Sequence, residues 1–261
     1  MALHPINRAL SYGEPLLFML VALYRFKGFF LVLFDIATLK VSPSELLSYD
    51  AISDRVFGKM WLRISEMETV VPALVGSASG TVLEIGPGSG NQLARYNKSN
   101  VTTIFGIEPN RHLHDELRAN VAKFGLQDIY RIVPFGIEEV QRMKSFGVEE
   151  GSIDTVLSVQ VLCGVPDPEQ VCKRMYRLLR PGGTMIVYEH VEAKDWLSRK
   201  VQGVYQIAWP WLMGGCSLVR PTADYLLSAG KWETVDLTSS AKEDPWLVIP
   251  RVSGKLIKAK S

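Results

Sequence analysis

From Gly80 onward, short runs of apolar and β-branched residues alternate with longer amphipathic runs, and this alternation limits the possible fold more than any other feature of the sequence. Strands that alternate with helices are typical of a parallel sheet with helices on its faces. We expect five strands of this kind, at residues 81–86, 101–109, 130–136, 153–162 and 184–191. Helices are expected to begin in the segment 91–97 and to cover residues 111–125 and 168–180. The sequence therefore predicts an α/β protein.

The last forty residues predict how the sheet ends. The run "TADYLLSAG" has the pattern of a helix that stops at Gly230, and two β-like runs, "WETVDLTS" and "SGKLIKAKS", follow it. Only a short connection that contains proline separates these runs, which favours an antiparallel hairpin at the edge of the sheet. A chain of 261 residues has room for one such domain and an appendage. We place the domain at residues 41–261 and the appendage at residues 1–40.

Composition excludes several classes of protein. A hydrophobic share of 47% with 21% charged residues is that of a folded protein and excludes a disordered one. The net charge of +2 gives no reason to expect a nucleic-acid partner. Cys163, Cys172 and Cys216 are scattered, so they predict no disulfide framework, no metal site and a reducing compartment. Nothing in the sequence indicates the oligomeric state.

The N-terminal forty residues contain two apolar runs, at 16–24 and 28–34, separated by Arg25 and Lys27. A membrane-spanning helix needs about 20 apolar residues with few charges, so this segment is not expected to cross a bilayer in the ordinary way. A cleaved signal peptide fits poorly, because the charges divide the apolar run instead of preceding it. The segment is either a helical lid packed on the domain or an anchor in the membrane interface. Its richness in Phe, Leu and Met favours the anchor.

The stretch "VLEIGPGSG" joins the first expected strand to a loop in which Gly86, Gly88 and Gly90 carry no Cβ. In a doubly wound sheet such a loop lies where ligands bind, beyond the carboxyl ends of the strands. Glu108 ends the second strand at roughly the 20-residue offset at which an acid meets the ribose hydroxyls of a nucleotide. The glycine spacing differs from that of a dinucleotide site, and Glu84 precedes the loop. These residues favour a cationic or zwitterionic adenosine ligand without phosphate.

Four motifs in order, "VLEIGPGSG", "GIEP", "GSIDTVLSVQVL" and "LLRPGGTMIVYEH", resemble those of class I S-adenosylmethionine-dependent methyltransferases. The resemblance implies a Rossmann-like fold with a mostly parallel seven-stranded sheet, helices on both faces, and S-adenosylmethionine as cofactor. Further segments, among them "VLCGVPDPEQVCKRMYRLLRPGG" and "WPWLMGGCSLVRPTADYLL", resemble the methyltransferase-like 7 family. That family comprises membrane-associated enzymes of the endoplasmic reticulum and lipid droplets that methylate small alkyl thiols. The resemblance strengthens the anchor hypothesis for residues 16–39.

The resemblance also implies roles for particular residues. Glu84 and the backbone from Gly86 through Gly88 to Gly90 are expected to hold the methionyl part of the cofactor, and Glu108 the ribose hydroxyls. Gly136 and Ile137 are expected to flank the adenine, and Gln160 to face the methyl-donor end. The acid often found directly after the small residue of the third motif is replaced by Ile137, with Glu138 one place later. The third motif therefore departs from the family pattern at the expected adenine contact.

The acceptor is expected to be small and lipophilic, because apolar and aromatic residues fill the insertion after the fifth strand: Trp196, Tyr205, Trp209 and Trp211. A thiol is favoured, since a group with a pKa near 8.5 needs little help from a base. His190, at the end of the fifth strand, is the candidate base or substrate contact, with a structural role as the alternative.

Several alternatives remain open at this point. The acceptor atom is sulfur, oxygen or nitrogen. The chain is an active methyltransferase, an inactive cofactor-binding scaffold on a membrane or, least of all, a nicotinamide oxidoreductase. We expect the protein at the cytoplasmic face of a membrane, with the endoplasmic reticulum or lipid droplets as its location.

Overall fold

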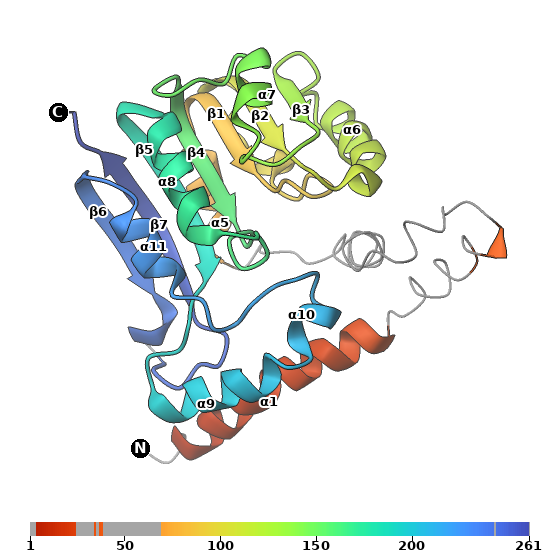
Figure 1. Cartoon of the computed structure of the whole chain (residues 1–261), viewed down its shortest axis with the longest axis vertical. Coiled ribbons are helices and arrows are strands. Elements are labelled where there is room, and N and C mark those ends of the chain that lie inside the picture. Colours follow the sequence, from red (N-terminus) through yellow and green to blue (C-terminus); the bar gives the residue numbers. More distant parts are fainter. Residues whose placement is uncertain (1–3, 25–33, 35–36, 39–68, 243, 261) are drawn as a thin grey trace.

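The computed structural model describes residues 4–24, 34, 37–38, 69–242 and 244–260, and these contain one sheet of seven strands (Figure 1). The strand order across the sheet is β3-β2-β1-β4-β5-β7-β6, and the first five strands are parallel. Their bounds are β1 (Gly80–Ile85), β2 (Val101–Ile107), β3 (Tyr130–Val133), β4 (Ile153–Val159), β5 (Leu179–His190), β6 (Trp232–Ser239) and β7 (Arg251–Lys258). The predicted mostly parallel, Rossmann-like sheet is confirmed.

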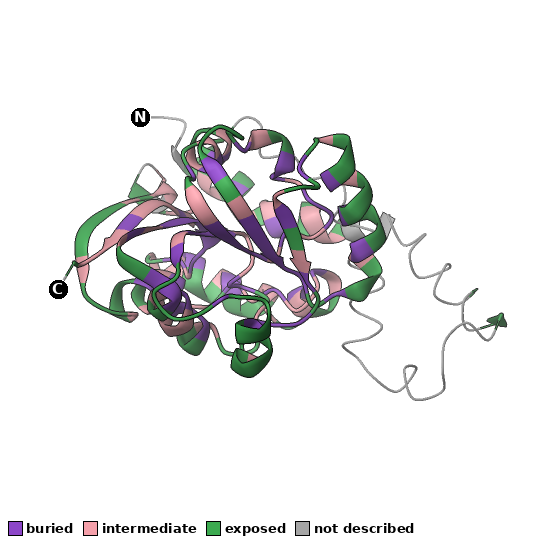
Figure 2. Cartoon of the chain, turned by 90° about the horizontal axis from the view of Figure 1, so that it is seen from above, coloured by how far each residue is buried: buried purple, intermediate pink, exposed green. Residues whose placement is uncertain are grey.

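Helices cover both faces of the sheet. Side chains of α5 (Val71–Gly76) and α6 (His114–Lys123) belong to the apolar cluster on one face. Those of α7 (Val140–Ser145), α8 (Pro168–Leu178) and α11 (Thr222–Ser228) belong to the cluster on the other face. Along β5, consecutive residues join the two clusters in turn, as the alternation of a strand requires. Figure 2 shows the buried residues concentrated in the strands and the exposed ones on the outer sides of the helices.

The expected hairpin closes the sheet. β7 pairs antiparallel with β5 on one side and with β6 on the other, so that β6 forms the edge. Gly254 of β7 has φ +140°, and a Cβ there would lie 2.0 Å from the carbonyl oxygen of Asp236. A glycine is needed at this position because the backbone of β6 passes so close.

The helix that we expected to begin in residues 91–97 does not form, and that prediction was wrong. Only a single 3-10 turn, η1 (Leu93–Arg95), follows the glycine loop. A turn at residues 97–100 follows one residue later, and β2 begins at Val101. Too few residues remain between the loop and this turn to offset the cost of nucleating a helix. The fifth strand also begins five residues earlier than expected, at Leu179 instead of Thr184.

The N-terminal segment begins as α1 (His4–Tyr24), which lies along α9 (Trp196–Tyr205) and α10 (Trp209–Leu212) in the lower part of Figure 1. Polar contacts hold one side of this helix on the domain. Arg8 Nη2 lies 3.1 Å from Asp195 Oδ2, and the Ser11 hydroxyl donates to the carbonyl of Trp246 at 3.2 Å. The first apolar run therefore belongs to a helix that packs on the domain, as the lid hypothesis requires.

The rest of the N-terminal prediction is tested only in part. Most of the second apolar run and the boundary near residue 40 lie outside the described residues. Of the helices that the structure describes, none has the length and hydropathy of a membrane-spanning helix.

Candidate active site

A cavity of about 390 Å³ opens at the carboxyl ends of the parallel strands. It lies at β1, whose neighbours in the sheet are β2 on one side and β4 on the other. Ligands of open α/β sheets bind at this point, because the connections diverge there. The sequence-predicted site residues that line the cavity are Glu84, Gly86, Gly88, Glu108, Gly136, Ile137 and Gln160. Gly90 and His190 are not part of its wall.

The three glycines of the loop serve different purposes. Gly86, Gly88 and Gly90 have φ values of 59°, 60° and 93°, a region that favours glycine. A Cβ on Gly86 would lie 2.8 Å from a methyl group of Val161, and one on Gly90 would lie 2.4 Å from Leu93 Cδ1. A Cβ on Gly88 would meet no atom within 4 Å. Gly86 and Gly90 are thus needed for packing, whereas Gly88 leaves open space in the cavity wall for a ligand.

Glu108 connects the loops that follow β1 and β2. Its carboxylate accepts a hydrogen bond from the backbone N–H of Gly88 at 2.8 Å and another from that of Asn110 at 2.9 Å. The residue is buried and still lines the cavity. A carboxylate oxygen offers more than one lone pair, so Glu108 can hold the glycine loop and also accept hydrogen bonds from a ligand diol.

Glu84 is a buried acid with one partner missing. The Tyr130 hydroxyl donates to its Oε2 at 3.0 Å, whereas its Oε1 and the neighbouring buried Tyr96 hydroxyl do not form a hydrogen bond of good geometry. Burial raises the pKa of Glu84 to about 7, although the hydroxyls of Tyr130 and Tyr96 lower it. A buried carboxylate oxygen at a cavity wall is suited to a cationic group of a ligand, which would supply the missing partner.

The loop after β3 also contributes to the wall of the cavity. Gly136 and Ile137 line the cavity, and Arg174 of α8 donates to the carbonyl oxygens of Ile137 and Glu138. The Glu138 carboxylate lies over Gly136, where a Cβ would come within 2.1 Å of Glu138 Oε1. The acid that the sequence places one residue late therefore still reaches the cavity wall. That Gly136 and Ile137 flank the adenine stays a prediction.

Gln160 begins the loop after β4 and has φ 57°, a conformation that non-glycine residues rarely adopt. The loop is held by Glu189 of β5, whose carboxylate accepts from the backbone N–H groups of Val161 and Leu162 at 3.0 Å and from the Ser158 hydroxyl at 2.7 Å. Burial raises the pKa of Glu189 to about 7, although these bonds lower it. Sequence reasoning missed this role, since no motif connects residues so far apart along the chain.

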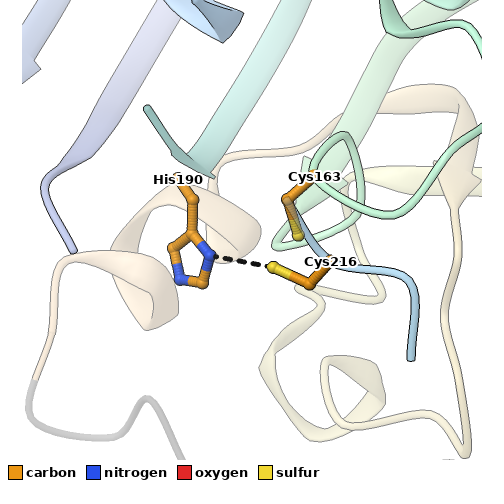
Figure 3. A group of neighbouring side chains, drawn as sticks. All are labelled: Cys163, His190 and Cys216. Carbon is orange, nitrogen blue, oxygen red and sulfur yellow. Dashed lines mark hydrogen bonds between the residues drawn. The ribbon is translucent and has the colours of Figure 1, made fainter. Parts of the chain in front are cut away.

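His190, Cys163 and Cys216 lie together beyond Gln160 (Figure 3). His190 Nδ1 is 3.6 Å from Cys216 Sγ, and its Nε2 is 3.5 Å from Gln160 Nε2. Cys163 and Cys216 line the cavity. The pKa of Cys216 lies well below its ordinary value, because it pairs with the Cys163 thiol and with His190. The same pairing and burial raise the pKa of Cys163.

The aromatic cluster that the sequence predicted over the acceptor site divides into two groups. Trp209 is buried and forms an apolar cluster with Cys163, Met213 and Cys216, against which Phe18 of α1 packs edge-on at 6.4 Å between ring centres. The exposed members of the four are Trp196 and Trp211. Only part of the cluster therefore borders the cavity end.

These residues fit a zwitterionic adenosine cofactor. The Glu84 oxygen without a partner suits an ammonium group, the open space at Gly88 admits a ligand against the backbone, and Glu108 suits a ribose diol. None of the three observations requires a phosphate site.

Comparison with known proteins agrees with this fit. Residues 83–187 match the methyltransferase domain family. The thiol S-methyltransferase TMT1B of Homo sapiens is 29% identical over 204 residues, covering 77% of this chain and 80% of the relative. TMT1A of Homo sapiens is 29% identical over 164 residues, covering 62% of this chain and 60% of the relative. The phosphatidylethanolamine N-methyltransferase of Cereibacter sphaeroides is 29% identical over 141 residues, covering 54% and 64%.

Two solved structures show that the fold is shared. An O-methyltransferase family protein from Burkholderia thailandensis has a TM-score of 0.61 at 14% identity, covering 91% of this chain and 71% of its own. The [4+2]-cyclase SpnF has a TM-score of 0.54 at 16% identity, covering 76% and 84%. Because these identities are low, the likeness concerns the fold alone.

Proposed function

This chain is a class I S-adenosylmethionine-dependent methyltransferase that resembles the methyltransferase-like 7 family, and from that premise we propose that it methylates a small lipophilic thiol. The observation that carries the proposal is the set of side chains that line the end of the cavity opposite the glycine loop, which we call the acceptor end. That end is bounded by Cys163, Val165, Met213 and Cys216. Such a wall suits a lipophilic acceptor better than a charged one. The names of the relatives TMT1A and TMT1B support the same choice.

The residues at the other end would hold the cofactor, whose sulfonium supplies an activated methyl group. Glu84 offers its unpartnered oxygen to the amino group, and Glu108 offers its carboxylate to the ribose. The bare backbone at Gly88 leaves room for the methionyl chain. Fixing both reactants in one cavity supplies the alignment that an in-line displacement needs.

An acceptor thiol needs little base catalysis, because a few per cent of it is already thiolate at neutral pH. His190 stays the predicted contributor among the titratable side chains of this end. Its ring nitrogens contact Gln160 and Cys216, and it does not line the cavity itself. It would therefore influence the acceptor through these two side chains, or directly if the Gln160 side chain moved aside.

Oxygen and nitrogen acceptors are the alternatives within the same reaction class. An inactive cofactor-binding scaffold is the alternative from another class, and the intact Glu84, Gly88 and Glu108 constellation argues against it. A nicotinamide oxidoreductase would require a pyrophosphate site, for which the glycine loop has the wrong spacing.

The test is turnover with three acceptors that share one lipophilic skeleton and differ only in carrying a thiol, a phenol or an amine. We expect the thiol to be methylated fastest at neutral pH, with Gly88→Val as the cofactor-free baseline. Faster turnover of the phenol or the amine would show that the preferred acceptor atom is oxygen or nitrogen instead of sulfur. No turnover above the baseline for any of them, with cofactor bound, would support the scaffold.

Membrane attachment is a second part of the proposal. The outer side of α1 exposes Ile6, Leu10, Leu17 and Leu20, and Trp196, Ile207 and Trp211 are exposed on the neighbouring α9–α10 segment. Apolar residues with tryptophan at the margin favour contact with a membrane interface. We expect flotation of the full chain with liposomes to weaken in a Leu10→Ser, Leu17→Ser double variant but not in Val235→Ser, which also replaces an exposed aliphatic side chain by serine but lies on β6. Equal flotation of all three proteins would exclude this surface. Location at the endoplasmic reticulum or lipid droplets stays a prediction.

A further inference from the structure

Three side chains that commonly bind soft metal ions converge from separate elements. Cys163 belongs to the loop after β4, His190 is the last residue of β5, and Cys216 belongs to the loop after α10 (Figure 3). Their sulfur and nitrogen atoms all lie within 4.8 Å of one another, and all three residues are buried. The sequence predicted no metal site, because the spacing of these residues along the chain does not show that they meet.

The distance between Cys216 and His190 fits a tetrahedral zinc site. With Zn–S bonds of about 2.3 Å and a Zn–N bond of about 2.0 Å, tetrahedral angles place sulfur and nitrogen about 3.5 Å apart and two sulfurs about 3.8 Å apart. Cys216 Sγ and His190 Nδ1 are 3.6 Å apart. Small side-chain rotations are enough to give Cys163 the remaining distances, since no pair exceeds 4.8 Å.

Hydrogen bonds from the backbone and from the Arg220 side chain hold the loops that carry the two cysteines. The N–H of Ser217 donates to the carbonyl of Cys163 at 2.9 Å, which ties the two cysteine segments together. Arg220 Nη1 donates to the carbonyls of Leu162 and Val165 at 2.7 and 2.6 Å. These bonds fix the relative positions of the two loops that carry Cys163 and Cys216.

Groups around the cluster match those that usually support metal ligands. The Nε2 atom of His190 faces the side-chain amide of Gln160, whose Oε1 has no partner among the described residues. Rotation of this amide by half a turn would let Oε1 accept the imidazole N–H while Nδ1 binds the metal. The indole N–H of the buried Trp209 forms no other hydrogen bond with the described residues and lies near enough to Cys216 Sγ to lower the pKa of that thiol. An N–H aimed at a metal thiolate stabilises its negative charge.

We propose that Cys163, His190 and Cys216 bind one zinc ion whose fourth position opens into the acceptor end of the cavity. Cys163 and Cys216 line that cavity, so an ion held between them faces it. Three protein ligands with one open position are typical of catalytic zinc sites, and His with two Cys is a known ligand set. The role of the open position rests on the proposed thiol acceptor.

At that position an acceptor thiol would lose its proton to water and bind as the thiolate, because metal coordination deprotonates thiols. The sulfur lone pair then forms the new S–CH3 bond as the bond between the methyl carbon and the cofactor sulfur breaks. The bonding electron pair stays on that sulfur, which gives S-adenosylhomocysteine. The product thioether has no charge to hold it on the metal and leaves.

Metal binding is tested by titrating the metal-free full chain, reduced with a phosphine, with Co²⁺ as a coloured substitute for Zn²⁺. We expect one equivalent to bind with a thiolate-to-cobalt charge-transfer band and the visible spectrum of a tetrahedral site, and Zn²⁺ to abolish both. Cys163→Ser, Cys216→Ser and His190→Asn should each lose more than about a hundredfold in affinity. Cys172→Ala is the matched control, because Cys172 is equally buried but lies in α8 outside the cluster. It should keep the site.

The wild-type spectrum keeps the proposal testable even if a variant fails to fold. Absence of the sulfur band in reduced wild type, or its persistence in both cysteine variants, would overturn the metal site. A Gln160→Leu variant should weaken binding by about 10- to 100-fold if Gln160 positions His190.

The role in acceptor activation needs a separate readout. Addition of a lipophilic thiol to the cobalt protein should shift the visible bands, whereas the matching phenol should leave them unchanged. Thiol methylation by the metal-free protein at an undiminished rate would overturn the role of the metal and leave the proposed function intact. Cobalt binding without any thiol methylation would overturn the proposed function and leave the metal site intact.

Discussion

The end of the cavity under the glycine loop and the end bounded by Cys163 and Cys216 differ in how the chain builds them. At the first end, Glu84, Gly88 and Glu108 lie on consecutive strands and loops, and their contacts follow from the βαβ order of the chain. At the second end, segments from α1, the loop after β4 and the insertion between β5 and α11 meet. The first end is therefore fixed by local backbone geometry, whereas the second depends on packing between distant segments. Substitutions at the two ends should separate cofactor binding from acceptor binding.

The largest effect is expected for Gly88→Val. The new side chain meets no protein atom at its Cβ and so projects into open space at the cavity wall, where it should reduce S-adenosylmethionine affinity by more than about a hundredfold. Strain at φ 60° adds a stability cost of about 1 to 2 kcal/mol.

Gly147→Val is the matched control for this strain, because Gly147 has φ 81°, open space where a Cβ would lie and an exposed position that is not part of the cavity wall. It should show a similar loss of thermal stability and normal affinity by calorimetry. Unchanged affinity in Gly88→Val would contradict the placement of the cofactor.

Glu108→Ala should weaken cofactor binding by about 1.5 to 3 kcal/mol, the usual worth of a hydrogen bond to a charged group. Part of this loss in binding free energy comes from the glycine loop, which is no longer held in place when the Gly88 N–H loses its acceptor on Glu108. Glu138→Ala removes an exposed acid from the same cavity and should cost less. Calorimetry that ranks the two variants in the opposite order would transfer the main role to Glu138.

A smaller effect is expected from the titration of Glu84. Burial raises its pKa to about 7, and an ammonium group of the cofactor requires the ionised form. Affinity should therefore fall by about tenfold as the pH is lowered from 7.5 to 6, with proton release on binding. Glu84→Gln should bind weakly without this pH dependence. Calorimetry in buffers of different ionisation enthalpy measures both quantities, and a flat wild-type profile would contradict the expectation.

The stability of the cofactor-free protein should depend on pH through Glu84 in the opposite direction to cofactor affinity: stability should fall as the pH rises, whereas affinity should increase. The folded state prefers the protonated acid, because its pKa is raised from 4.5 to about 7. Its contribution to the free energy of unfolding is then fully present below pH 4.5 and is lost as the pH rises through 7.

The smallest effect is expected at the acceptor end. Phe18→Ala removes the edge-on contact with Trp209, which is worth about 0.5 to 1.5 kcal/mol. The KM for the acceptor should rise by about two- to tenfold while the dissociation constant of the cofactor stays the same. Leu17→Ala changes the neighbouring exposed residue of α1 and serves as the control. If Phe18→Ala shifts cofactor affinity instead, the two ends are not separable.

Much of the first end could be predicted from the sequence. Strand positions follow from apolar runs, and Glu84, Gly88 and Glu108 are placed by their spacing from those strands, since parallel strands bring their carboxyl ends to one edge. The helix expected after the glycine loop was wrong because local pattern does not show that too few residues remain before β2.

The sequence by itself determined the α/β order, the closing hairpin and the residues of the glycine loop, because each depends on neighbours a few positions apart. Only the tertiary structure brought His190, Cys163 and Cys216 together, placed α1 over the insertion and assigned Glu189 to the loop after β4. Those contacts join residues separated by tens to hundreds of positions. Their geometry is set by how helices and loops pack on the finished sheet, and no short-range spacing in the chain encodes that packing.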